Sequence, residues 1–146
     1  MKEYLSRLES LLAYAEEKEL SIINEGNHVL HSFIENTLSF NGKAGDKENR
    51  CHYCYKTRLE LCAIRAMEAG YDGFSTTLLI SPYQNHEEIK RLGNEIALLH
   101  NIEFIYRDFR PRFRESQKQA REMSFYMQKY CGCIFSEIES RTEKKK

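Results

Sequence analysis

Two pairs of closely spaced cysteines are the residues in this chain whose type and spacing could do chemistry. Cys51 and Cys54 are separated by two residues, which places both thiols within one turn of a helix. Such a pair can bind Zn²⁺, hold part of an iron–sulfur cluster or act as a redox couple. We expect the pair at a helix start, where backbone N–H groups favour thiolate over thiol. The alternative is two small residues that merely pack at this spacing.

The second pair, Cys131 and Cys133, is separated by one glycine. Two such cysteines can close a very small disulfide ring, and strain in the ring makes the bond easy to reduce, as in a catalytic disulfide. Gly132 supplies the backbone freedom that closure requires. Alternatively, one of these cysteines could join Cys51 and Cys54 around a structural zinc, although 76 residues separate Cys54 from Cys131. The fifth cysteine, Cys62, is expected to be a small core residue.

A basic and aromatic stretch occupies residues 107–129, with seven Lys or Arg against three Asp or Glu. Arginines contact phosphates and aromatic rings stack on unpaired bases, so this stretch could bind a single-stranded loop of RNA. The alternative is a solvated helix face with some aromatic side chains in the core. The chain's Lys and Arg total equals its Asp and Glu total at 22 each, so an anionic partner would need such a local patch.

The length and composition indicate one globular domain. Its 146 residues can bury a genuine core, and an odd number of cysteines without a signal peptide indicates the cytoplasm. No apolar run approaches the roughly 18 residues of a membrane span. We therefore expect metal or redox cysteines rather than structural disulfides, and no membrane partner.

Hydrophobic periodicity predicts the elements that must position these residues. In order, they are helix 2–18, strand 20–23, helix 28–38, a mobile loop at 41–49, helix 51–69, strand 74–80, helix 86–100, strand 102–106, loop 108–113 and helix 114–129. Gly70 is the expected C′ residue of its helix, and Asn85 with Glu88 forms an expected capping box. The order predicts a single α/β domain over residues 1–140 with a mostly parallel sheet, followed by a charged tail at 141–146. Parallel α/β folds usually begin with a central strand, whereas this chain begins with a helix.

Four segments, in their order and spacing, resemble the QueH-type epoxyqueuosine reductases. They are 51–60 (CHYCYKTRLE), 74–83 (FSTTLLISPY), 108–111 (DFRP) and 130–136 (YCGCIFS). The resemblance implies a cytoplasmic enzyme that reduces the epoxide of epoxyqueuosine, at the wobble position of tRNA, to the alkene of queuosine without cobalamin. It also implies a Rossmann-like parallel sheet of the adenine-nucleotide α-hydrolase type.

The resemblance also implies roles for the cysteines. Cys51 and Cys54 correspond to two ligands of a [4Fe–4S] cluster. Cys131 and Cys133 correspond to a redox-active disulfide, which receives its electrons from an unidentified donor. The partner is tRNA carrying epoxyqueuosine, and DNA is not expected. The arginines expected to place this tRNA are Arg58, Arg110, Arg112 and Arg114.

The chain departs from the family pattern at its start. Family members begin with an apolar strand ending in Cys-Cys-x-Pro, which provides the other two cluster ligands, and this sequence contains no adjacent cysteines. We therefore expect a domain truncated at its N-terminus relative to the family, without the first strand and without two of the ligands. The alternative function is a non-catalytic or inactive remnant that binds tRNA or a structural zinc.

Overall fold

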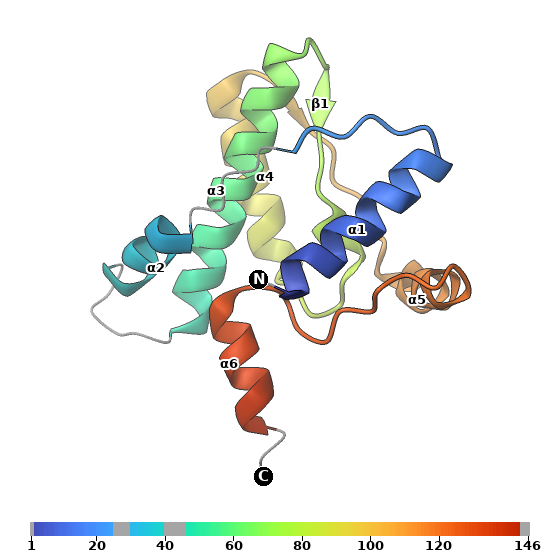
Figure 1. The fold of residues 1–146 in the computed structure, drawn as a ribbon. Coiled ribbons are helices and arrows are strands. Elements are labelled where there is room, and N and C mark those ends of the chain that lie inside the picture. Colours follow the sequence, from blue (N-terminus) through green and yellow to red (C-terminus); the bar gives the residue numbers. More distant parts are fainter. Residues whose placement is uncertain (1, 25–29, 40–45, 144–146) are drawn as a thin grey trace. The chain divides into compact units, whose positions relative to one another are not determined.

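The computed structural model describes residues 2–24, 30–39 and 46–143 (Figure 1). The chain divides into two compact units, one formed by residues 29–113 and the other by residues 1–28 together with 114–146. It is an α/β protein, mostly helical, with one small parallel sheet in the described residues. No helix in the described part is long and apolar enough to cross a membrane. The single domain over 1–140 stays a prediction.

The unit formed by residues 29–113, called the central unit because it is the middle part of the sequence, is built around a long helix and a parallel pair of strands. Its elements are α2 (Leu30–Ser39), α3 (Lys47–Glu68), β1 (Gly73–Phe74), the 3₁₀ turn η1 (Thr77–Ile80), α4 (His86–His100), β2 (Glu103–Phe104) and the 3₁₀ turn η2 (Arg110–Arg112). The predicted helix at 28–38 corresponds to α2, and its first residues lie outside the described residues, as does most of the predicted loop at 41–49.

Helix α3 begins one turn earlier than predicted. Asp46 is its N-cap, and the Asp46 carboxylate accepts a hydrogen bond from the backbone N–H of Glu48 at 3.0 Å. Cys51 therefore lies inside the helix rather than at its start, so the expected stabilisation of a thiolate by unpaired N–H groups at Cys51 is wrong. The predicted C-terminus is confirmed, because Gly70 follows the C-cap with φ +74°.

The sheet is smaller than predicted. Gly73 pairs with Glu103 and Phe74 with Phe104, and the strands run parallel. The predicted strand at 74–80 ends after Phe74, because the Thr76 hydroxyl accepts a hydrogen bond from the N–H of Leu78 and caps η1 instead. The predicted strand at 20–23 is also wrong, since residues 20–24 are irregular and exposed.

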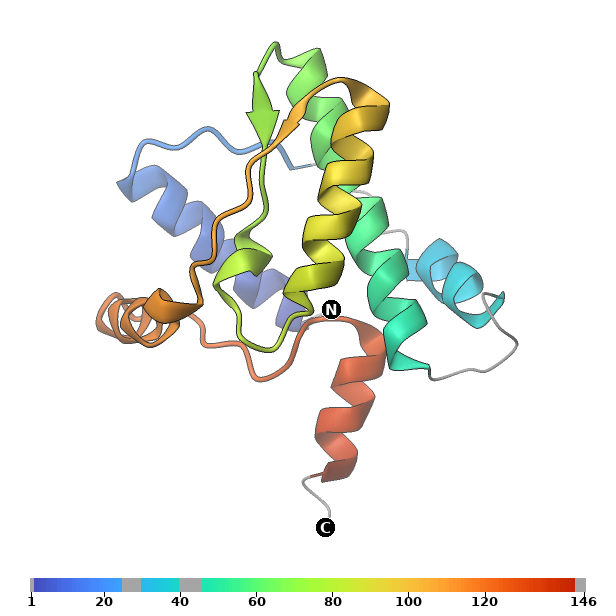
Figure 2. The same cartoon turned by 180° about the vertical axis from the view of Figure 1, so that it is seen from behind.

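The core of this unit lies between α3, α4 and the two strands, which Figure 2 shows side by side. Its buried hydrophobic residues are Tyr55, Leu59, Ala63, Ala66, Phe74, Leu79, Ile89, Leu92, Ile96, Ile102 and Phe104. The rings of Phe74 and Phe104 join the strands, with centroids 5.1 Å apart. The core therefore fixes β1 and β2 against α3, which carries Cys51 and Cys54.

One half of the predicted capping box of α4 is confirmed, whereas the Asn85 N–H donates to the Tyr55 hydroxyl at 3.3 Å and not to Glu88. The Asn85 side-chain oxygen accepts a hydrogen bond from the Glu88 N–H at 3.1 Å. We expect Asn85→Ala to lower the free energy of unfolding by about 1 kcal/mol, because an N–H at the helix start loses its acceptor. Urea denaturation measures this change, and Asn85→Asp, which keeps an acceptor, is the matched control. Equal stability of Asn85→Ala and the parent chain would contradict the expectation.

The second unit contains α1 (Lys2–Glu17), most of α5 (Phe113–Glu122) and α6 (Ile134–Glu143). Helix α1 confirms the predicted helix at 2–18. The predicted helix at 114–129 is too long, because α5 ends at Glu122 and Ser124 has a left-handed φ of +57°. Helix α6 was not predicted, and it extends into the predicted tail at 141–146. Between α5 and α6, the chain packs on α1 through Tyr14 and Phe125, whose ring centroids lie 5.8 Å apart.

Candidate functional site

Cys51 and Cys54 lie one turn apart on α3, and both are half-buried. His52, between them, hydrogen-bonds through Nδ1 to Oε1 of Glu88 on α4 at 2.5 Å. Hydrogen bonds from Arg91 are the largest cause that lowers the pKa of Glu88, to about 2, and His52 adds to the effect. Glu88 is therefore ionised at neutral pH and orients His52 beside the cysteine pair.

The cysteine pair on α3 offers two thiols of the type that iron–sulfur clusters use. Among residues 2–24, 30–39 and 46–143, no three His, Cys, Asp or Glu side chains form a group that could hold a metal ion. The described residues therefore do not bring a third side chain of these types to Cys51 and Cys54. A cluster does not fit these residues alone.

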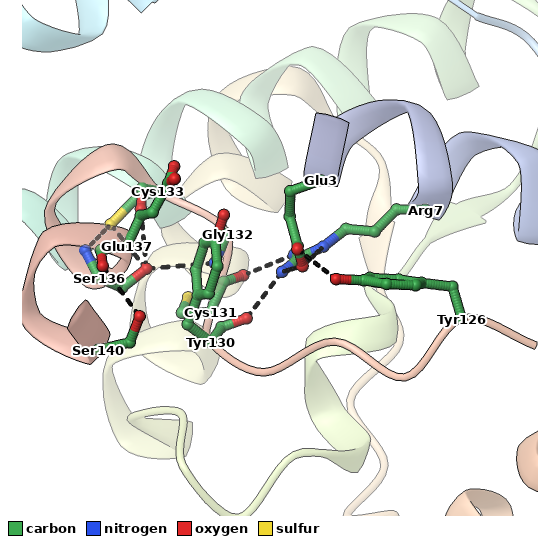
Figure 3. A network of polar contacts seen from close by, with 10 residues as sticks. All are labelled: Glu3, Arg7, Tyr126, Tyr130, Cys131, Gly132, Cys133, Ser136, Glu137 and Ser140. Carbon is green, nitrogen blue, oxygen red and sulfur yellow. Dashed lines mark hydrogen bonds and ion pairs between the residues drawn. The ribbon is translucent and has the colours of Figure 1, made fainter. Parts of the chain in front are cut away.

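The second cysteine pair lies in the turn that leads into α6 (Figure 3). Cys131 is exposed, Cys133 is half-buried, and both are thiols. Cys133 occupies the N-cap position of α6, because its sulfur accepts a hydrogen bond from the Ser136 N–H at 3.3 Å and its carbonyl accepts from the Glu137 N–H at 3.1 Å. The pair is therefore reachable from solvent at Cys131 and fixed by a helix at Cys133.

Cys62 is exposed, so the expectation that it is a core residue is wrong. Its sulfur lies 3.7 Å from the carbonyl oxygen of Ser75, and desolvation there raises the pKa of the Cys62 thiol. A thiol that stays protonated is a poor nucleophile and a poor metal ligand. Cys62 therefore provides a natural reference thiol for experiments on the other four.

A pocket of about 540 Å³ opens at the carboxyl ends of β1 and β2. Its lining consists of Ser75, Thr76, Thr77, Ile80 and Phe109. It joins three residues that carry hydroxyl groups with one aromatic ring, and the Phe109 N–H donates to the carbonyl of Leu79 at 3.1 Å, which fixes the loop after β2 against η1. Its exposed lining is almost entirely apolar, because the Ser75 hydroxyl donates to the carbonyl of Ile105 and the Thr76 hydroxyl accepts from the Leu78 N–H. Ligands in α/β proteins bind at this end of parallel strands, and an apolar lining with one aromatic ring suits stacking of a flat ring such as a nucleobase.

The four arginines predicted to place RNA differ in their surroundings. Arg58 is exposed on α3, Arg112 is exposed in η2, and Arg114 is exposed on α5. Arg110 binds the Asp108 carboxylate through Nε at 2.8 Å and Nη2 at 2.5 Å. This pair holds the pKa of Asp108 down to about 2, so at neutral pH an adjacent carboxylate balances the charge of Arg110. Arg110 and Arg112 directly follow Phe109 of the pocket, whereas Arg58 belongs to a different element.

Sequence reasoning missed His86 and Arg7, which make hydrogen bonds to the segments that carry the family resemblance or lie next to them. His86 is buried, and its Nε2 donates to the carbonyl of Ser81 at 3.1 Å while its Nδ1 lies 3.3 Å from the Tyr106 hydroxyl. Because a carbonyl can only accept, Nε2 carries a proton. The other residue is Arg7 of α1, which donates to the carbonyls of Tyr130 and Cys131 (Figure 3). Sequence spacing gives no sign of either contact except the i, i+4 pair of Glu3 with Arg7.

Comparison with known proteins identifies one family. The sequence model of the family described as epoxyqueuosine reductase QueH matches residues 1–139. Three curated proteins with the name epoxyqueuosine reductase QueH are similar to the chain. The relative from Dehalococcoides mccartyi is 31% identical, over 94% of this chain and 72% of its own length. Those from Helicobacter pylori and Thermotoga maritima are each 36% identical, over 92% and 66% of this chain but only 38% and 52% of their own lengths.

Proposed function

Because the chain belongs to the QueH family of epoxyqueuosine reductases, we propose that it reduces epoxyqueuosine in tRNA to queuosine, in the cytoplasm, with Cys131 and Cys133 as the immediate source of electrons. The observation that carries this proposal is the pair of thiols in one turn, one exposed and the other at the start of α6. A dithiol of this kind can release two electrons and two protons as it closes to a disulfide.

The thiols of Cys131 and Cys133 account for all the electrons and protons that the reaction consumes. The epoxide of the substrate loses its oxygen as water and becomes an alkene, which requires two electrons and two protons. The Cys131 and Cys133 thiols supply both as their S–H bonds break and an S–S bond forms. An external thiol or protein reductant then returns the disulfide to the dithiol, and this donor remains unidentified.

The pocket at the ends of β1 and β2 is a proposed contact site for a base of the tRNA. Phe109 offers a ring for stacking, and the rest of the lining is apolar, which suits the face of a base. The parallel pair of strands, joined through α4, supports a Rossmann-like sheet of the adenine-nucleotide α-hydrolase type. We place the tRNA backbone against Arg58, Arg110, Arg112 and Arg114.

Cys51 and Cys54 are the proposed iron–sulfur ligands of this chain. Their type and their common helix face support two ligands of a [4Fe–4S] cluster, and a complete cluster requires thiolates beyond those that the described residues bring together. Such a cluster would supply single-electron chemistry.

The experiment that tests the function is complementation with the full chain. A bacterial strain without its own epoxyqueuosine reductase accumulates epoxyqueuosine in tRNA, and nucleoside mass spectrometry separates this from queuosine. The proposal expects queuosine to reappear when the chain is expressed. Binding of tRNA without any queuosine, by soluble and folded protein, would instead support the non-catalytic reading and contradict the proposal.

We expect substitutions of the arginines to weaken tRNA binding and a substitution of the neighbouring Asp108 to strengthen it. Arg112→Gln or Arg114→Gln should weaken binding and reduce the slope of log affinity against log salt by about one, because each substitution removes one phosphate contact. Asp108→Asn should strengthen binding, because it unbalances the charge of Arg110. Fluorescence anisotropy with labelled tRNA at several salt concentrations measures both. Identical slopes in all three variants and the parent chain would remove these residues from the interface.

A further inference from the structure

We propose that Arg7 is a positioning residue that holds segment 130–132 in the backbone shape that the Cys131 and Cys133 thiols need to close into a disulfide. This inference rests on the proposed function, because it assigns a role in the same redox pair. It concerns contacts within one unit of the chain, between the first turns of α1 and the turn before α6. Figure 3 shows Arg7 pointing from α1 to the carbonyl groups of this turn.

The guanidinium of Arg7 binds two consecutive carbonyl oxygens. Its Nη1 donates to the carbonyl of Cys131 at 3.1 Å, and its Nη2 donates to the carbonyl of Tyr130 at 2.8 Å. Its Cζ also lies 5.3 Å from the centre of the Tyr130 ring, which adds a cation–π contact. Hydrogen bonds from a charged donor are stronger than neutral ones, and the planar fork fixes both peptide groups at once. Arg7 therefore fixes the peptide group on the N-terminal side of Gly132.

Other residues of the unit hold Arg7 itself in place. Nε and Nη2 of Arg7 donate to Oε1 of Glu3 at 2.9 and 2.7 Å, and the Tyr126 hydroxyl donates to the other oxygen of Glu3. Desolvation raises the pKa of Glu3, but the hydrogen bonds from Tyr126 and Arg7 outweigh it, so the pKa is lowered and Glu3 stays ionised at neutral pH. The side chains of Arg7 and Glu3 are only 25% and 19% exposed. The guanidinium is thus oriented before any change at the cysteines.

Gly132 shows how closely Arg7 approaches the turn. Its φ of +114° lies in a region that residues with a Cβ rarely adopt. A Cβ built on Gly132 would lie 2.3 Å from Nη1 and 3.2 Å from Cζ of Arg7, so any side chain here would have to displace the guanidinium. The single glycine between the cysteines therefore serves two needs, the backbone conformation and the space for Arg7.

The other side of the turn is held by α6. The Gly132 N–H donates to the Ser136 hydroxyl at 3.2 Å, and this hydroxyl donates to the Cys133 carbonyl at 2.9 Å. Arg7 on one side and the first turn of α6 on the other therefore restrain the backbone around both sulfur atoms. We take this restrained backbone shape to be close to that of the closed ring, so that closure costs less conformational entropy and the disulfide is favoured over the dithiol.

The test measures the thiol–disulfide equilibrium of Cys131 and Cys133 in the full chain without tRNA. Protein is equilibrated in buffers with a series of reduced to oxidised glutathione ratios, the thiols are trapped by alkylation, and mass spectrometry of the peptide gives the disulfide fraction. We expect Arg7→Gln to shift the equilibrium about tenfold toward the dithiol. Arg7→Lys, which keeps the charge but not the planar fork, should give a smaller shift in the same direction.

Two further variants keep the test decisive. Tyr126→Phe removes a hydrogen bond to Glu3 without touching Arg7 and should give a small shift toward the dithiol, even if Arg7→Gln fails to fold. Arg121→Gln changes an exposed arginine of α5 and should leave the equilibrium unchanged within twofold. An unchanged equilibrium in folded Arg7→Gln, a shift toward the disulfide, or an equal shift in Arg121→Gln would overturn the inference.

The result can be separated from that of complementation. If the equilibrium depends on Arg7 but no queuosine forms, the positioning role stands and the proposed reduction fails. If queuosine forms and the equilibrium is indifferent to Arg7, the reduction stands and the positioning role fails.

Discussion

Serine in place of Cys131 or Cys133 is expected to reduce queuosine formation at least about a thousandfold, the scale of loss when a residue that takes part in the chemistry is removed. A hydroxyl cannot form a disulfide, so neither variant can release the two electrons that the epoxide requires. Both residues lie in a turn with partial exposure, so the substitutions remove little core packing. The loss is therefore expected without a loss of folding.

Queuosine in total tRNA from the complemented strain measures the effect, with protein level checked in the same cells. Cys62→Ser is the matched control, because Cys62 is exposed and belongs to α3 rather than to the turn before α6, and it should keep normal queuosine. Normal queuosine in Cys131→Ser and Cys133→Ser would show that the electrons do not come from this pair. A loss with Cys62→Ser as well would point to a general effect on folding.

Alanine in place of Gly93 is expected to destabilise the central unit by about 1–3 kcal/mol, the usual cost of overpacking a core. Gly93 is buried in the middle of α4, and a Cβ there would lie 2.2 Å from two carbons of the Phe104 ring. This ring is buried in β2 and packs on Phe74, so it cannot move aside without disturbing the core. Alanine is the better helix former by about 1 kcal/mol, which offsets only part of the clash.

Urea denaturation followed by circular dichroism measures this effect. Asn94→Ala, at the next and exposed position of α4, is the control and should leave stability unchanged or slightly higher. Phe104→Leu combined with Gly93→Ala should cost less than the sum of the two single changes, because the smaller side chain relieves the contact. Additive costs, or an unaffected Gly93→Ala, would contradict the close packing of α4 on β2.

Local features of the fold were predictable from the sequence. Asn85 with Glu88 and the glycine at position 70 mark helix ends by side-chain or backbone chemistry within a few residues, and both helix ends are confirmed. The length of the strands was overestimated, because a strand depends on a partner that is distant in the sequence. The run of β-forming residues at 74–80 says nothing about whether a partner strand reaches it, and Thr76 uses its hydroxyl to cap a 3₁₀ turn instead.

The candidate site was predictable only in part. The spacing of the cysteines in the sequence reveals the two pairs. The resemblance gave the family, which the comparisons confirm. Arg7 was not predictable, because it lies 124 positions before Cys131, whose carbonyl it binds. The error at Cys62 has a simpler cause, since periodicity placed it in the core, whereas the residue lies at the surface with its sulfur beside the carbonyl of Ser75.

The central claim is that the Cys131 and Cys133 dithiol delivers the electrons for epoxide reduction. A single-turnover reaction tests it most directly, with fully reduced chain in excess over tRNA that carries epoxyqueuosine and with all other reductants removed. Mass spectrometry then counts queuosine in the tRNA and the disulfide between these two cysteines in the protein. The account predicts one new disulfide for each queuosine formed. Queuosine without that disulfide, or disulfide at an equal level when the tRNA carries no epoxide, would contradict it.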